Sequence, residues 1–121
     1  MLKQGLRFAV VGIANSLMHA AVAVFAHQIG GFNAVESNIC GFIIAFLFSF
    51  IMNTYWSFER KPSGQFFIRF LTVNLMALTY ILVVSALSDN MNWTPITGIM
   101  LVVLVLPLIS FLTHKYWTYA D

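Results

Sequence analysis

The chain has 121 residues, which is enough for a single domain. Only 8% of the residues are charged and 60% are hydrophobic, whereas a soluble domain carries about 25% charged residues because its surface faces water. A chain of this composition would expose large apolar patches in water and would aggregate. The composition therefore excludes an ordinary soluble domain and predicts an integral membrane protein.

Six basic and four acidic residues divide the chain into four long uncharged stretches, at 8–35, 37–58, 70–88 and 90–114. Each stretch is close to the roughly 20 residues that a helix needs to cross the hydrocarbon of a bilayer. The stretches are continuously apolar rather than alternating, which favours helices over the strands of a barrel. We therefore predict one all-α membrane domain over residues 1–121, with four transmembrane helices near 8–29, 35–56, 67–88 and 94–115.

The basic residues predict the orientation of these spans. With four spans, both termini lie on the same side as the central loop, and that side holds every basic residue: Lys3, Arg7, Arg60, Lys61, Arg69 and Lys115. The opposite side holds Glu36 and Asp89 and no basic residue. The positive-inside rule then predicts that both termini lie in the cytoplasm.

The two halves of the chain resemble each other. An Arg-Phe pair opens each half, as Arg7-Phe8 and, 62 positions later, as Arg69-Phe70. An aromatic motif closes each half, as Asn53–Phe58 and, 61 positions later, as His114–Tyr119. We interpret the match as an internal duplication, with repeat 1 at about 6–58 and repeat 2 at about 68–119. Because each repeat crosses twice, the repeats would be parallel.

Small residues recur at every fourth position in the first two predicted spans. They are Gly12, Ser16 and Ala20 in the first span, and Gly41, Ala45 and Ser49 in the second. Such a stripe lets a neighbouring helix backbone approach closely. Packing between spans of one chain and pairing of two copies are both compatible with this pattern.

Polar side chains within the predicted spans are the candidate functional groups, because they are costly in hydrocarbon. Asn15 and His19 are four residues apart and share a helix face, and Asn53 and His114 occupy equivalent positions in the two repeats. The alternative for each is a structural hydrogen bond between helices, worth about 1 kcal/mol.

Several function classes lack their usual signatures. No predicted span has an acid at its centre, which disfavours a proton-coupled exporter of cationic small molecules. There is no Asp-x-Asp pair and no glycine-rich phosphate loop. The three histidines are scattered, and none has a carboxylate or thiol nearby at the spacing of metal ligands. We expect neither enzymatic activity nor a metal or other cofactor, and nothing indicates a nucleic acid partner.

The two motifs resemble those of a known family. The pattern Arg7-Phe8-x-x-Val11-Gly12, followed by Asn15, resembles the opening of the GtrA-like family. The run 53–58, preceded by Ser49 and Phe50, resembles that family's Asn-Arg-x-Trp-Thr-Phe signature, and Arg69-Phe70 and Trp117 complete the layout.

Two positions depart from the family pattern. Thr54 replaces the arginine that usually follows the signature asparagine, although Lys115 keeps a base at the equivalent position of the second repeat. His19 falls where many relatives carry an acid. Details of substrate or of coupling can therefore differ in this chain.

The resemblance implies a role in cell-surface polysaccharide or teichoic acid glycosylation at the cytoplasmic membrane of a prokaryote. A separate glycosyltransferase would load a sugar onto undecaprenyl phosphate, and the GtrA-like protein would act as a flippase for this polyprenyl-phosphate-linked sugar. Four short helices enclose little volume, so we expect a homo-oligomer. The alternatives are a membrane scaffold that recruits or stabilises the glycosyltransferase and, third, a small-molecule exporter.

The flippase hypothesis assigns roles to three groups of residues. The phosphate of the lipid headgroup would be bound by Arg7, Arg69 and Lys115, because the arginine fork donates two hydrogen bonds to such an anion. Trp56 and Trp117 would flank the headgroup at the membrane interface. The translocation path would be lined by Asn15, His19, Asn53 and His114.

Overall fold

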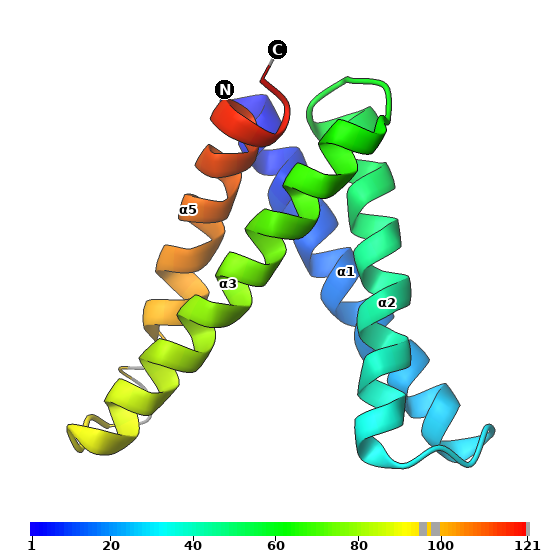
Figure 1. The fold of residues 1–121 in the computed structure, drawn as a ribbon, viewed down its shortest axis with the longest axis vertical. Coiled ribbons are helices and arrows are strands. Elements are labelled where there is room, and N and C mark those ends of the chain that lie inside the picture. The colour runs from blue at the N-terminus through cyan, green and yellow to red at the C-terminus, as the bar shows by residue number, and fades with distance from the viewer. Residues whose placement is uncertain (95–96, 98–99, 121) are drawn as a thin grey trace. The chain divides into compact units, whose positions relative to one another are not determined.

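The structure is a computed structural model that describes residues 1–94, 97 and 100–120. The described residues form helices and no strands. The chain divides into two compact units, Met1–Pro62 and Ser63–Asp121, and each unit is a helical hairpin (Figure 1). We call them the N-terminal hairpin and the C-terminal hairpin.

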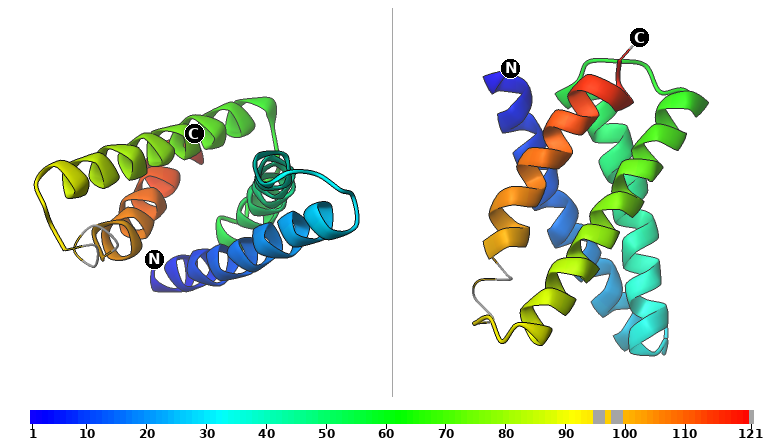
Figure 2. Two further views of the ribbon diagram at one scale, coloured as in Figure 1. Left: turned by 90° about the horizontal axis from the view of Figure 1, so that it is seen from below. Right: turned by 60° about the vertical axis from the view of Figure 1, so that its left-hand side comes forward.

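The N-terminal hairpin consists of α1 (Leu2–Gln28) and α2 (Ala34–Met52), and α2 continues into the π-helical turn η1 (Asn53–Ser57). The two helices run side by side in opposite directions (Figures 1 and 2). They approach closely at Gly41, where a Cβ atom would lie 2.7 Å from the carbonyl oxygen of His19 and 3.0 Å from its ring Cδ2. Glycine is therefore required at this contact.

Polar groups close the turn between α1 and α2. Asn33 and Glu36 form a reciprocal cap, in which the Glu36 N–H donates to Asn33 Oδ1 at 2.8 Å and the Asn33 N–H donates to Glu36 Oε1 at 3.1 Å. His27 Nδ1–H donates to the Phe32 carbonyl oxygen at 2.8 Å, and Gly31 adopts a positive φ of 71°. Glu36 and His27 thus stabilise the turn between the helices.

The C-terminal hairpin consists of α3 (Gly64–Asn90), the π-helical turn η2 (Leu101–Val105), α5 (Leu106–Thr113) and the π-helical turn η3 (His114–Thr118). Ser63 caps α3, since its Oγ accepts from the Phe66 N–H at 3.1 Å. Pro107 lies in the first turn of α5, directly after η2. Proline lacks the N–H that a regular helix needs at that point, and the widened turn accommodates this loss.

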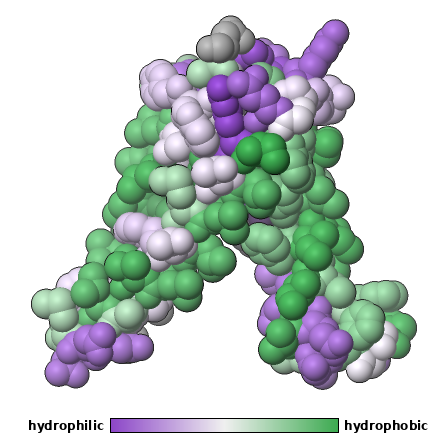
Figure 3. Space-filling view, viewed as in Figure 1, coloured by the Kyte–Doolittle hydropathy of each residue, from purple (hydrophilic) through white to green (hydrophobic). Residues whose placement is uncertain are grey.

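Three helices are long and apolar enough to cross a membrane: Leu2–Gln28, Ala34–Ser57 and Gly64–Asn90. Only 6%, 28% and 17% of their most apolar segments is buried within the structure, so the remaining apolar surface is available to lipid. Hydrophobic residues cover the middle of each hairpin and hydrophilic residues gather toward its ends (Figure 3). The chain is an all-helical, multi-pass membrane protein.

The fourth predicted span, near 94–115, includes residues 95–96 and 98–99, which lie outside the described residues. From Leu101 onward η2, α5 and η3 follow one another without a break to Thr118, and α5 is much shorter than the other helices. An arrangement of four spans as two parallel repeats stays a prediction.

The contact at Gly41 yields a test of the N-terminal hairpin. We expect Gly41→Ala to lower the free energy of unfolding by about 1–3 kcal/mol, because the added methyl group overlaps a backbone atom that cannot move aside. Unfolding of the purified protein in mixed detergent micelles, followed by circular dichroism, measures this change.

The matched control is Gly12→Ala in α1, where a Cβ atom would meet nothing within 4 Å. This variant should be as stable as the parent chain or slightly more stable, because alanine favours the helix over glycine. Equal stability of both variants would show that the close approach at Gly41 is not needed.

Candidate functional site

Each hairpin has an open end, which is the end opposite its connecting segment. At the open end of the N-terminal hairpin, Arg7 of α1 reaches the end of η1. Its Nη1 donates to the Trp56 carbonyl oxygen at 2.8 Å and to Glu59 Oε1 at 3.0 Å. The guanidinium carbon lies 5.2 Å from the centre of the Trp56 ring, within the range of a cation–π interaction. One arginine thus joins both helices and orients a tryptophan.

The open end of the C-terminal hairpin repeats this arrangement with Arg69 of α3. Its Nη1 donates to the carbonyl oxygens of Trp117 and Ala120, both at 3.1 Å. The guanidinium carbon lies 5.8 Å from the centre of the Trp117 ring. The carbonyl end of a helix carries partial negative charge and lacks backbone donors, so both arginines stabilise the helix ends that they contact.

The two arginines differ in their third partner. Arg7 forms an ion pair with Glu59, which adopts a positive φ of 53° in the segment after η1. The position 61 residues later holds Ala120, which offers Arg69 a neutral carbonyl oxygen instead. Among the residues that the structure describes, no carboxylate pairs with Arg69. Among the described residues, Arg7 therefore has a carboxylate partner, whereas both partners of Arg69 are neutral.

A buried polar network supports the turn η1. Asn53 is central to it, because its Nδ2 donates to Ser49 Oγ at 3.1 Å and its Oδ1 accepts from Ser57 Oγ at 2.8 Å. Thr54 Oγ1 donates to the Phe50 carbonyl oxygen at 2.6 Å. Asn53 is only 2% exposed. The network keeps polar groups satisfied at a point where the helix widens.

His114 has the corresponding place in η3. Its Nδ1 forms a hydrogen bond of 2.9 Å with Thr118 Oγ1, and its ring stacks on Phe70 with 4.4 Å between the ring centres. His114 is 2% exposed. Asn53 and His114 therefore lie inside the packing of their own hairpins, and their assignment to a translocation path stays a prediction.

Asn15 and His19 lie one turn apart on α1 and are both half-buried. His19 Nε2–H points at Asn38 Oδ1 of α2, at 3.4 Å. Asn15 Oδ1 is buried and has no hydrogen-bond partner within the described structure. The structure thus adds Asn38 to the polar residues of this hairpin. Its only signal in the sequence is an amide inside an apolar run, which does not say which helix it faces.

The remaining predicted site residues lie at the open ends of their own hairpins. Trp56 is 37% exposed and Trp117 is 43% exposed. Lys115 of η3 is half-buried, and its Nζ lies 5.9 Å from the centre of the Tyr116 ring. Within the described residues no cluster of histidine, cysteine and acidic side chains could hold a metal ion. Each open end thus combines a cation with aromatic rings, a combination that suits an anionic headgroup.

The unpaired acceptor of Asn15 has a consequence for stability. We expect Asn15→Leu to raise the free energy of unfolding by about 1 kcal/mol, because it removes a buried acceptor that lacks a donor. Unfolding in mixed detergent micelles measures the change.

The control for this variant is Asn74→Leu in α3. Asn74 Nδ2 donates to the Phe70 carbonyl oxygen at 2.9 Å, so its replacement should bring no gain in stability. A loss of stability in Asn15→Leu would mean that Asn15 has a partner in the folded protein.

The comparison with known proteins identifies the family of the chain. The family model described as GtrA/DPMS, transmembrane domain, matches residues 7–119. This range runs from Arg7 to Tyr119, the residue that follows η3. No curated protein and no solved structure matches the chain at a significant level. The matched residues cover nearly the whole chain, which therefore belongs to the GtrA/DPMS transmembrane domain family.

Proposed function

We propose that this protein is a flippase that carries a polyprenyl-phosphate-linked sugar across the cytoplasmic membrane of a prokaryote. The family match fits a membrane protein of a glycosylation pathway. In this proposal both termini lie in the cytoplasm, because all six basic residues then lie on the cytoplasmic side. A separate glycosyltransferase loads the sugar onto the lipid, and several copies of the chain assemble around the path.

The observation that carries the proposal is the hydrogen bonding of Arg69. Both of its hydrogen bonds come from Nη1 and go to neutral carbonyl oxygens. With respect to the residues that the structure describes, the donors on Nη2 and Nε remain for a ligand. The guanidinium is always charged and its planar fork matches a phosphate. An interfacial arginine held in this way is prepared to bind the phosphate of a lipid headgroup.

Arg7 and Lys115 complete the proposed phosphate-binding residues, and the exposed Trp56 and Trp117 flank them. Arg7 is the weaker of the two arginines for a phosphate, since Glu59 already neutralises it. Deeper in the N-terminal hairpin, the sugar hydroxyl groups meet Asn15 and His19, with Asn38 beside them. Asn53 and His114 hold the turns that carry the tryptophans.

The proposal predicts that Arg69→Gln slows lipid transfer at least about tenfold, because a charge-assisted, two-pronged contact with the phosphate is lost. Arg69→Lys should lie between Arg69→Gln and the parent chain, since lysine keeps the charge without the fork. The measurement uses purified protein in liposomes with a fluorescent polyprenyl-phosphate sugar. It follows the fraction of the lipid that a membrane-impermeant quencher reaches over time.

Lys61→Gln is the matched control, because it removes a positive charge from an exposed side chain just before α3. It should transfer lipid at the parent rate. Transfer by the folded parent protein no faster than in empty liposomes would overturn the proposal and favour the scaffold hypothesis. Equal slowing by Lys61→Gln would show that net charge, and not the Arg69 site, is responsible.

A second prediction concerns Glu59. We expect Glu59→Gln to raise the apparent affinity for the lipid phosphate severalfold, because it releases Arg7 from its ion pair. The gain should shrink between low and physiological ionic strength as salt screens the exposed site. Titration of the fluorescent lipid in the same liposomes measures the affinity. No change in affinity at low salt would mean that Arg7 does not contact the phosphate.

A further inference from the structure

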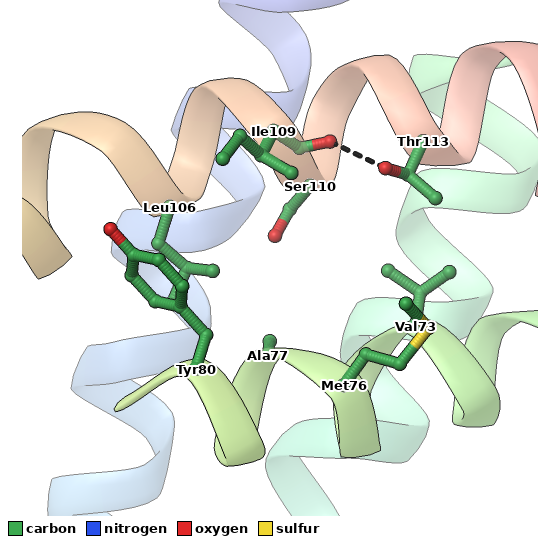
Figure 4. A pocket seen from close by; sticks show the side chains of 8 residues that line it. All are labelled: Val73, Met76, Ala77, Tyr80, Leu106, Ile109, Ser110 and Thr113. Atoms are coloured by element: carbon green, nitrogen blue, oxygen red, sulfur yellow. Dashed lines mark hydrogen bonds between the residues drawn. The ribbon is translucent and has the colours of Figure 1, made fainter. Parts of the chain in front are cut away.

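The C-terminal hairpin contains a cavity of about 170 Å³ between α3 and α5. Figure 4 shows its lining side chains, which point toward one another from the two helices. Val73, Ala77 and Tyr80 of α3 face Thr113, Ile109 and Leu106 of α5. A cavity of about 150 Å³ in a protein holds a benzene molecule, so the space is large enough for a short branched hydrocarbon segment.

The wall of the cavity offers few hydrogen bonds to an occupant. Thr113 Oγ1 donates to the Ile109 carbonyl oxygen at 2.8 Å, and the Tyr80 hydroxyl donates to the Leu101 carbonyl oxygen at 3.0 Å. Ser110 adds one further hydroxyl group, and the rest of the wall is almost entirely apolar. Water needs two to four polar partners to occupy a cavity, so the occupant that suits this space is an apolar chain.

The cavity begins about one helical turn from the open end of the same hairpin. Val73, at its edge, lies one turn after Arg69 on the same face of α3. Thr113, at the opposite edge, is followed directly by η3, whose Trp117 carbonyl oxygen binds Arg69. A cation at the interface is thus followed by an apolar cavity at membrane depth. This order matches a lipid with an anionic head and an apolar tail.

The N-terminal hairpin is built differently at the equivalent positions. Offsets of 62 and 61 residues relate Ala77 to Asn15 and Ile109 to Phe48. The N-terminal hairpin therefore has an amide in place of Ala77 and a phenyl ring in place of Ile109. Among the described residues, the C-terminal hairpin combines this apolar cavity with an arginine that no carboxylate pairs with.

We infer that this cavity receives the isoprenoid chain of a polyprenyl phosphate next to its phosphate, while Arg69 binds that phosphate. The identity of the lipid rests on the proposed function, and the position of its tail rests on the cavity. Bulk lipid chains compete for the same space and are equally apolar, so packing must distinguish between them. A chain with a methyl branch in every unit fills a short, wide cavity, whereas a straight chain leaves part of the wall without contacts.

The first test maps the tail directly on the parent protein. The full chain in phosphatidylcholine nanodiscs is irradiated with a polyprenyl phosphate that carries a diazirine in the isoprenoid unit nearest the phosphate. Peptide mass spectrometry should place the adducts within 73–80 and 106–113. Adducts confined to the N-terminal hairpin, or spread evenly over all lipid-facing helices, would overturn the inference.

The second test fills the cavity. Ala77→Phe should weaken binding of a fluorescent polyprenyl phosphate in the same nanodiscs at least about tenfold, because a misfit of a single methylene group in an apolar pocket already costs about tenfold or more. Ala86→Phe is the matched control, because Ala86 is an exposed residue on the opposite face of α3. Ala77→Leu makes a smaller change and serves if Ala77→Phe does not fold. Binding equal to that of the parent chain in the folded Ala77 variants would overturn the inference.

Two comparisons distinguish the isoprenoid tail site from a site for any apolar chain and from the flippase proposal. Hexadecyl phosphate, a straight-chain competitor, should displace the polyprenyl phosphate poorly, and equal displacement would overturn the assignment to an isoprenoid chain. Binding is measured here and transfer is measured in the liposome assay. Adducts in the cavity without any transfer would leave the tail site standing and overturn the flippase proposal. Transfer without binding in the cavity would leave the flippase proposal standing and overturn the tail site.

Discussion

Each hairpin depends on an arginine that joins the start of one helix to the end of the other. The last carbonyl groups of a helix have no partner within that helix, and lipid supplies none. Arg7 and Arg69 meet this need by donating to the carbonyl oxygens of Trp56 and Trp117. The same guanidinium groups lie over the tryptophan rings. A charged group that already holds a fixed position loses little freedom when a ligand arrives, which is the physical advantage of a site built on helix ends.

The two hairpins share this frame but differ in what it surrounds. In the N-terminal hairpin Glu59 compensates the arginine, and a pair of amides and a histidine lie between the helices. In the C-terminal hairpin a neutral carbonyl oxygen replaces the carboxylate, and an apolar cavity occupies the space between α3 and α5. Charge and apolar volume are thus combined in one hairpin, while the other holds the polar side chains. The proposed cargo has an anionic head, a polar sugar and a long apolar tail, and each of these parts would need a different environment.

The helices could be predicted from the sequence because bilayer thickness imposes a length on apolar runs. Their ends were less predictable: α1 already begins at Leu2 and α3 at Gly64, since a helix continues through polar residues after it leaves the hydrocarbon. The structure brings the arginine of each Arg-Phe pair into contact with the aromatic motif of the same hairpin, whereas the roles predicted for these residues stay predictions. The ion pair of Glu59 and the contact between His19 and Asn38 could not be predicted, because they depend on the register of one helix against the other. The cavity depends on the summed volumes of facing side chains, which no periodic pattern encodes.

Arg7 and Asn15 lie on the same helix but differ in their hydrogen bonding. Arg7 Nη1 has two hydrogen-bond acceptors, whereas the buried oxygen of Asn15 has no donor among the described residues and costs stability in a low-dielectric environment. The two residues are eight positions apart, which corresponds to about 12 Å along the helix axis. An acceptor without a donor is poorly suited to hold a hairpin together, but it suits a hydroxyl group that passes by. In the proposed flippase, this acceptor would be satisfied only while a sugar hydroxyl group is present, so it would lower the energy of the cargo inside the membrane without strengthening binding at the interface. A carrier of this kind needs such a distribution, because tight binding at the entrance alone would slow the lipid's departure.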